Sequence, residues 1–333
     1  MRVFQLDLVL GLALTLFSAP SFSVQAGPIA LNFPLKCADG QTCLVQNYVD
    51  ADPGHAAVDY LCGAQTYGGH NGVDIRISDL AAQRRGVEVV AAAPGVVLRL
   101  RDGVSDLLIR APGAPSILGQ ECGNGLIIDH GAGWETQYCH MANGSPSVRV
   151  GQRLVAGTVL GRVGLSGATE FPHLHLTVRY QGRVVDPFTP GLPGSHCSPI
   201  MVGDLWTPAA RHLLAYRAGA VLNSGFSSQV MSMEAVEEGR LTPPELAAPF
   251  LVAYVRAIHL KAGDIQVLSV TGPLGAALAS STSPALGRDQ AQSLTYVGLR
   301  RPETGWKPGT YTARYKVMRL GHAVVSQTFS TKF

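Results

Sequence analysis

Two histidines alternate with leucines in the segment FPHLHLTVRY, which spans residues 171–180. Because successive side chains of a β-strand point to opposite faces, His173 and His175 would share one face, while Leu174 and Leu176 would pack on the other. Two imidazoles on one face of a strand are suited to binding a metal ion. In a chain with 10 histidines among 333 residues, however, a His-x-His triplet arises by chance roughly one time in three. The motif therefore needs partners elsewhere in the chain.

A second pair of candidate ligands lies upstream, in the segment His70-Asn71-Gly72-Val73-Asp74. Gly72 permits a tight bend, which would let the imidazole of His70 and the carboxylate of Asp74 turn toward one point. Two imidazole nitrogens and one carboxylate oxygen around an open position form the ligand set of a catalytic zinc site. His70, Asp74 and one of the strand histidines meet that count. The spacing alone leaves open which strand histidine is the third ligand.

A further histidine, His140, ends a strand-like segment that follows a glycine-containing turn. Alternation predicts that Tyr138 and His140 share a face of this strand and that Cys139 takes the other. The chain has no His-Glu-x-x-His segment, so no glutamate of that kind is available as a general base, and an imidazole is the natural replacement. His130 lies in the turn itself, where we expect a structural hydrogen bond and no metal.

Short apolar runs separated by glycines must position these residues between His70 and Pro190. Many short strands with regular turn signals predict an all-β sandwich or barrel, and they leave almost no place for a helix. The predicted strands are Val87–Ala93, Gly95–Leu100, Leu107–Arg110, Gly125–Asp129, Thr136–His140, Val148–Val150, Arg153–Val163 and His173–Val178. The preceding residues 27–69 hold three cysteines and little periodicity, which indicates an irregular lead-in held by disulfides.

The cluster LPGSHCSP, within residues 191–200, marks a boundary between two domains. Beyond it the chain predicts a second, smaller β-sandwich with a short helix somewhere in residues 228–246. This part has no clustered histidines, cysteines or carboxylates, so it either docks the chain on a partner surface or only supports the first domain. Its predicted strands are Phe250–Leu260, Ile265–Val270, Leu294–Leu299, Thr310–Met318 and Val324–Phe329. The expected division is therefore 1–26, 27–69, 70–198 and 199–333.

The first 26 residues combine one arginine, an apolar run from Leu8 to Phe17 and small residues that end in Val24-Gln25-Ala26. This pattern predicts a secretory signal peptide cleaved after Ala26, in preference to a retained anchor, because the apolar run is too short to span a bilayer. No later segment is long and apolar enough for a transmembrane helix. The formal net charge of +3 and the lack of Lys or Arg runs give no reason to expect a nucleic-acid partner. We therefore expect a periplasmic or secreted protein.

Six cysteines in an exported chain predict three disulfides. Cys122 and Cys139 flank two runs that are joined by a short turn, and in the resulting hairpin facing residues approach to bonding distance. The two cysteines are not equidistant from the turn, so a bulge is also required. Cys37 with Cys43 would close a short loop, which leaves Cys62 to pair with Cys197.

The chemical motifs follow one another in a defined order along the chain. His70-x-x-x-Asp74 is followed by Gly123-Asn124-Gly125, Asp129-His130-Gly131, Thr136-x-Tyr138-x-His140 and His173-Leu174-His175. This order resembles the lysostaphin-type (LytM-domain, duplicated hybrid motif) zinc metalloendopeptidases of metallopeptidase family 23, over about residues 68–188. The resemblance implies a compact antiparallel β-sandwich or barrel-like catalytic domain with a groove above its sheet. By position, His70, Asp74 and His175 match the family's ligands for one Zn²⁺ per chain, and His140 and His173 match its two catalytic histidines.

The resemblance also implies a function, which is hydrolysis of the peptide cross-links of peptidoglycan by zinc-activated water. The rival interpretation is a catalytically inactive relative of the same fold that binds the cell wall or regulates a hydrolase. Five polar groups that converge on one point have no purpose in a scaffold, and groups of this kind cluster where chemistry happens. The sequence therefore favours an enzyme acting on peptidoglycan peptides, and it leaves open which of His140 and His173 acts as the base.

Overall fold

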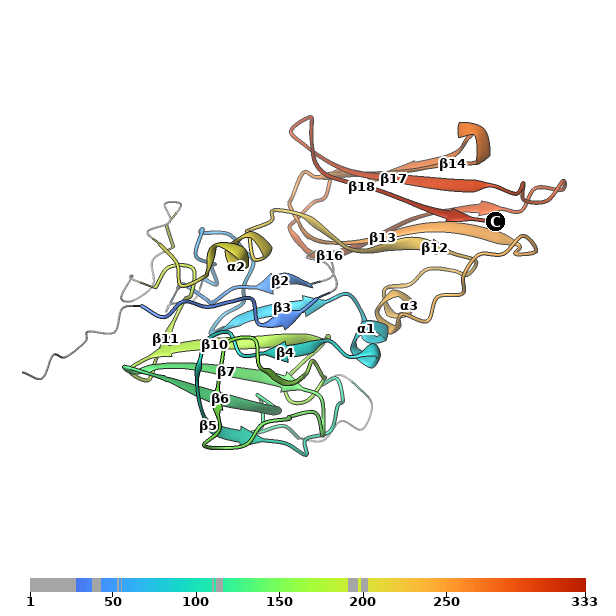
Figure 1. The fold of residues 1–333 in the computed structure, drawn as a ribbon. Helices are drawn as coiled ribbons and strands as arrows, with labels where there is room; N and C mark the ends of the chain where they lie inside the picture. Colours follow the sequence, from blue (N-terminus) through green and yellow to red (C-terminus); the bar gives the residue numbers. More distant parts are fainter. Residues whose placement is uncertain are drawn as a thin grey trace, which may run out of the picture.

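The computed structural model describes residues 28–37, 43–52, 54, 56–109, 111, 116–190, 197–198 and 203–333. The predicted signal peptide, residues 1–26, lies outside these ranges. Figure 1 shows two β-rich parts: one holds the blue to green strands, and the other, in orange and red, packs against its upper edge. No helix among the described residues is long and apolar enough to cross a membrane.

The first part is built on an eight-stranded sheet with the order β2-β3-β10-β7-β6-β5-β8, in which β11 also pairs with β10. All of these pairings are antiparallel, which confirms the predicted all-β, antiparallel fold class. The strands are β2 (Cys43–Asn47), β3 (Val73–Ile77), β5 (Gly95–Arg101), β6 (Asn124–Gly131), β7 (Trp134–Met141), β8 (Arg153–Leu154), β10 (His173–Tyr180) and β11 (Arg183–Val185).

A second, three-stranded sheet packs against one face of the large sheet, and the core lies between them. Its order is β1-β4-β9, formed by Leu35–Lys36, Glu88–Val90 and Val159–Arg162. Alternation decides which side chains enter this core: Leu174, Leu176 and Val178 of β10 are at most 1% exposed and belong to one apolar cluster with residues of both sheets. The histidines of β10 alternate with these residues and so emerge on the opposite face.

The C-terminal part is the predicted β-sandwich. A three-stranded sheet, β12-β13-β16, faces a four-stranded sheet, β15-β14-β17-β18, and a buried cluster that includes Val255 of the first sheet and Leu268 and Tyr315 of the second joins the two. The strands are β12 (Ala220–Ser227), β13 (Phe250–Leu260), β14 (Ile265–Thr271), β15 (Ala277–Thr282), β16 (Gln290–Arg300), β17 (Thr310–Arg319) and β18 (His322–Lys332), with a 3₁₀ turn, η1, at Pro273–Gly275. Strands β12 and β15 were not predicted from the sequence.

Three expectations about the first part are wrong. Leu107–Ile109, the described part of one predicted strand, and Val148–Val150 form turns and loops, because their apolar residues have no neighbouring strand to pair with. The segment 27–69 is not wholly irregular: β1 and β2 lie within it, and β2 pairs with β3. The first part also contains a helix, α1 (Leu80–Arg85), whose first turn is capped by the side chain of Asp79. This Asp cap is a recognised helix-start signal.

Two further short helices follow in the sequence, and the first of them packs on the first part of the molecule, where its Ala210 belongs to the apolar cluster. Helix α2 spans Pro208–Leu213 and helix α3 spans Met233–Glu238, and α3 confirms the short helix expected within residues 228–246. Glu237 of α3 contacts both Arg76 on β3 and Arg256 on β13. The two arginines are at most 1% exposed, so one carboxylate holds two buried guanidinium groups where the two parts of the molecule meet.

The structure contains the three predicted disulfides. Cys122 pairs with Cys139, Cys37 with Cys43, and Cys62 with Cys197. The hairpin β6–β7 carries the bulges that the first pairing requires, since its register shifts between Asn124 and Leu126.

Candidate metal and catalytic site

Three potential ligand atoms converge at the junction of β3 and β10. Asp74 and His175 face each other directly in the register of these strands, and His70 precedes β3. The Nε2 atom of His70 lies 3.2 Å from Nδ1 of His175 and 3.1 Å from Oδ1 of Asp74, and the last two atoms are 2.8 Å apart. The three predicted ligands therefore surround one point.

The outer side of each of these groups is fixed by a hydrogen bond. Nδ1 of His70 lies 2.6 Å from the carbonyl oxygen of Tyr48, so it carries the proton and leaves Nε2 free to bind a metal. Nε2 of His175 lies 3.1 Å from Oδ1 of Asn71, which leaves its Nδ1 free. Asn47 donates to Oδ2 of Asp74 at 2.8 Å. Outer partners of this kind set the tautomer and direction of metal ligands.

The arrangement fits zinc in its donor types and spacing. Zinc bonds to histidine nitrogen and carboxylate oxygen at about 2.0–2.1 Å in tetrahedral geometry, which places neighbouring ligand atoms about 3.3 Å apart. The observed separations of 2.8–3.2 Å are smaller by a few tenths of an ångström. His175, and not His173, shares a group with His70 and Asp74, so geometry favours it as the third ligand.

Burial and neighbouring charges shift the pKa values of the candidate ligands. Burial alone would raise the pKa of the Asp74 carboxyl, but His173, His175 and His70 together hold that pKa well below its ordinary range. Burial lowers the pKa of His175, and the Asp74 carboxylate offsets this only in part. These directions favour an ionised Asp74 and a neutral His175, which are the states that metal binding requires. Burial alone would lower the pKa of His70, but Asp74 outweighs it and that pKa is raised.

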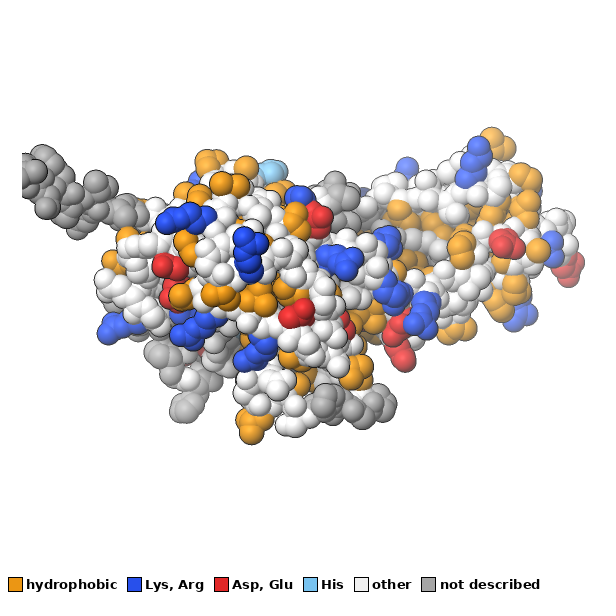
Figure 2. Space-filling model, turned by 60° about the horizontal axis from the view of Figure 1, so that its bottom comes forward, with side chains coloured by type: hydrophobic (Ala, Val, Ile, Leu, Met, Phe, Trp, Pro, Cys, Tyr) orange, Lys and Arg blue, Asp and Glu red, His pale blue; other side chains and the backbone are white. Residues whose placement is uncertain are grey.

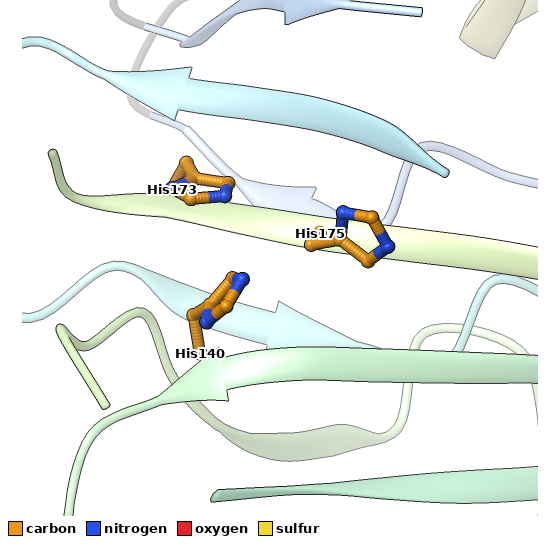
Figure 3. A group of neighbouring side chains, drawn as sticks. All are labelled: His140, His173 and His175. Atoms are coloured by element: carbon orange, nitrogen blue, oxygen red, sulfur yellow. The ribbon is translucent and has the colours of Figure 1, made fainter. Parts of the chain in front are cut away.

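His140 and His173 form a second group with His175, in which one ring nitrogen of each lies within 4.8 Å of the others. Figure 3 shows His173 and His175 on one strand and His140 reaching toward them from the end of the neighbouring strand, β7. Nδ1 of His140 lies 2.8 Å from the carbonyl oxygen of Ser166, and Nδ1 of His173 lies 2.9 Å from that of Phe171. Both rings therefore present Nε2 to the site. Burial, with His173 and His175 nearby, holds the pKa of His140 well below its ordinary value.

The predicted alternation of Tyr138, Cys139 and His140 is wrong. Cys139 directly faces His175 in the register of β7 and β10, so the disulfide lies on the same face as the site. Tyr138 points into the core, where its hydroxyl accepts a hydrogen bond from the backbone of Ala92. His140 still reaches the site because its φ of +60° breaks the alternation. A non-glycine residue in this left-handed region is uncommon and is found at functional sites.

A cleft of about 620 Å³ opens beside the site, with Asp74 and His173 in its wall. Its other side is formed by α3 and β16 of the C-terminal part, through Met233, Glu234 and Gln292. The C-terminal β-sandwich thus borders the groove in which the histidines lie.

His130 is outside both histidine groups; its ring contacts the hydroxyl of Thr136 and the carbonyl of Pro94, which confirms the structural role expected for it.

Sequence reasoning missed the residues that hold the ligands. Asn47 and Tyr48 belong to the segment taken as an irregular lead-in, and the short run Cys43–Val45 was the only local sign of a strand there. Thr177, whose hydroxyl is 3.1 Å from Nε2 of His175, could have been found, because it lies two residues further along the same strand face.

Comparison with known proteins places this site in a family context. The family described as Peptidase family M23 matches residues 68–187. An uncharacterized metalloprotease of Haemophilus influenzae is 30% identical over 126 residues, which make up 38% of this chain and 22% of that protein. The DD-carboxypeptidase/endopeptidase Mpg of Neisseria meningitidis is 37% identical over 71 residues, 21% of this chain and 16% of Mpg.

Solved structures give weaker overall matches. The catalytic domain of the antimicrobial peptidase lysostaphin from Staphylococcus simulans is 22% identical, with 42% of this chain and 85% of that chain covered and a TM-score of 0.28. The matched region spans 22% and 16% of the lengths of the two curated relatives described above.

Proposed function

Because residues 68–187 match peptidase family M23, we propose that this protein is a zinc metalloendopeptidase that hydrolyses the peptide cross-links of peptidoglycan outside the cytoplasm. One observation carries the proposal: the free ring nitrogens of His70 and His175 and one oxygen of Asp74 meet at a single point, and two further imidazoles border it. A scaffold without chemistry has no need for this convergence. The name of the relative Mpg, a DD-carboxypeptidase/endopeptidase, supports a peptidoglycan substrate.

In this proposal His70, Asp74 and His175 hold the ion. When bound, zinc supplies a Lewis acid that lowers the pKa of a coordinated water and polarises the peptide carbonyl. His140 and His173 face the same space with Nε2, since Nδ1 of each is turned to a backbone carbonyl. One of these rings accepts a proton from the attacking water, and the other donates a hydrogen bond to the oxygen on which charge develops.

Purified protein lacking residues 1–26 tests the proposal. We expect about one zinc per chain and release of new amino groups from peptidoglycan, both lost in His175→Ala. Chelator should abolish product release, and added zinc should restore it. His140→Ala should keep the zinc but lose most of the activity. If the protein held no zinc and neither wild type nor His140→Ala released product, the inactive scaffold would be the better description.

A further inference from the structure

The face of the sheet that carries the histidines continues beyond them toward β5. In the strand registers Thr177 of β10 faces Gln137 of β7, Gln137 faces Ile127 of β6, and Ile127 faces Arg99 of β5. Side chains that face each other directly across a pair of strands lie on one side of the sheet. Arg99 therefore emerges on the same face as Thr177, whose hydroxyl touches His175.

This part of the face holds a second cleft, of about 570 Å³. Gln137, Arg99, Arg101 and Arg179 line it, and Glu135 is the one acidic residue among its described lining residues. Three arginines and one glutamate leave a formal charge of +2. The space-filling view in Figure 2, which brings the β5 side of the molecule forward, shows basic side chains spread over the exposed surface of this part.

The three arginines are not held by a salt bridge among the described residues, although the charge of Arg101 acts on the Glu121 carboxyl. No ion pair or side-chain hydrogen bond involves Arg99, Arg101 or Arg179 within the part of the chain that the structure describes, although Glu135 faces Arg179 across the strands. Arg99 and Arg101 lie two residues apart on β5, and an anion that enters this cleft can accept hydrogen bonds from the guanidinium groups that line it.

The opposite end of the groove has the opposite charge. The cleft beside His173 is lined by Asp74, Glu170 and Glu234, together with Glu237, whose charge is shared by the buried Arg76 and Arg256. An anionic group of a bound peptide is therefore favoured at the β5 end and disfavoured at the α3 end. Because the two clefts differ in charge, an anionic peptide is expected to bind in one orientation.

The geometry of the sheet gives the distances from the histidines to the arginines of this cleft. Arg179 is four residues from His175 on β10, about 13 Å at 3.3 Å per residue. Arg101 lies three strands away, about 14 Å at 4.7–4.9 Å per strand. An extended peptide crosses either distance in roughly four residues, which is within the length of a cross-linked pair of short peptides.

We propose that Arg99, Arg101 and Arg179 form a subsite for the free carboxylates of the substrate peptide, so that the protein selects anionic peptides over their amidated forms. This inference rests on the proposed function. The planar guanidinium group binds a carboxylate through two parallel N–H donors, and a carboxamide offers neither the charge nor two acceptors. Gln137, on the floor between the arginines and the histidines, donates to both sulfurs of the Cys122–Cys139 disulfide and is thereby held in place.

The test uses a synthetic cross-linked peptide with free carboxylates and its carboxamide analogue. For wild type we expect kcat/KM to be roughly tenfold higher on the carboxylate peptide, taking about threefold for each of two partly exposed charge contacts. Arg99→Gln combined with Arg179→Gln should bring the ratio of the two kcat/KM values close to one. The exposed Arg314→Gln on β17 is the matched control and should behave as wild type. A preference that survives in the double variant, or is absent from wild type, would overturn the inference.

Fluorescence anisotropy of the same two peptides separates this inference from the proposed function. If wild type hydrolyses neither peptide, the endopeptidase proposal fails, but tighter binding of the carboxylate peptide that is lost in the double variant still supports the subsite. Equal binding of both peptides by wild type counts against the subsite whatever the hydrolysis assay gives.

Discussion

Asn47 offers a direct test of how the metal site is held. Its side-chain amide donates to Oδ2 of Asp74 at 2.8 Å, and Asp74 is only 2% exposed, so water does not readily replace this donor. A hydrogen bond to a charged group contributes about 1.5–3 kcal/mol. At 1.36 kcal/mol for each factor of ten, Asn47→Ala should raise the dissociation constant of zinc roughly ten- to hundredfold, the range known for outer-shell partners of metal ligands.

The measurement is a competition titration of zinc against a chelator of known affinity at one pH. Gln327→Ala on β18 removes an amide in the C-terminal sheet and should leave zinc affinity unchanged. Thermal unfolding of the zinc-free proteins checks that Asn47→Ala is folded. A folded Asn47→Ala protein that binds zinc within about twofold of wild type would show that this hydrogen bond does not position the carboxylate. Absence of zinc binding by wild type would instead count against the proposed metal site.

Three further predictions concern stability. Burial raises the pKa of the Asp186 carboxyl from 3.8 to about 7, and its Oδ2 has no hydrogen-bond partner among the described residues. The free energy of unfolding of the wild type should therefore fall as the pH rises from about 4 to about 7. At pH 8 the free energy of unfolding of Asp186→Asn should exceed that of the wild type by up to about 4 kcal/mol. Urea unfolding at pH 4.5 and pH 8 measures this, and an equal effect at both would contradict the assignment. Glu237→Gln leaves two buried arginines without their shared carboxylate and should lower the free energy of unfolding by about 3 kcal/mol or more, whereas the exposed neighbour Glu234→Gln should change it little. Replacing Cys122 and Cys139 by serine opens a link across 17 residues and should cost about 3 kcal/mol by chain entropy; an unchanged denaturation midpoint would argue against this bond.

The chemical groups of the site could be predicted from local sequence, but the residues that hold the metal ligands in place could not. Alternation within one strand places His173 and His175 on one face, and that inference needs no distant residue. The face occupied by Cys139 was predicted wrongly because the positive φ of His140 is not visible in a pattern of residue types. Asn47 reaches Asp74 only because β2 pairs with β3, and such pairing depends on contacts across the sheet.

Strand β2 connects the candidate metal site to the C-terminal β-sandwich. Its register shifts between Val45 and Asn47, and such a bulge re-aims the side chains around it. Asn47 turns to Asp74, while its neighbour Gln46 donates to the carbonyl of Ala291 on β16, and the Gln46 carbonyl contacts the ring of His259 on β13. Any displacement of the sandwich relative to the large sheet would therefore pull on the peptide next to the residue that holds Asp74. Helix α3 and strand β16 also line the cleft beside His173. The C-terminal part therefore contacts both the cleft and the strand that holds the metal ligand Asp74. A role limited to docking on a surface does not account for these contacts.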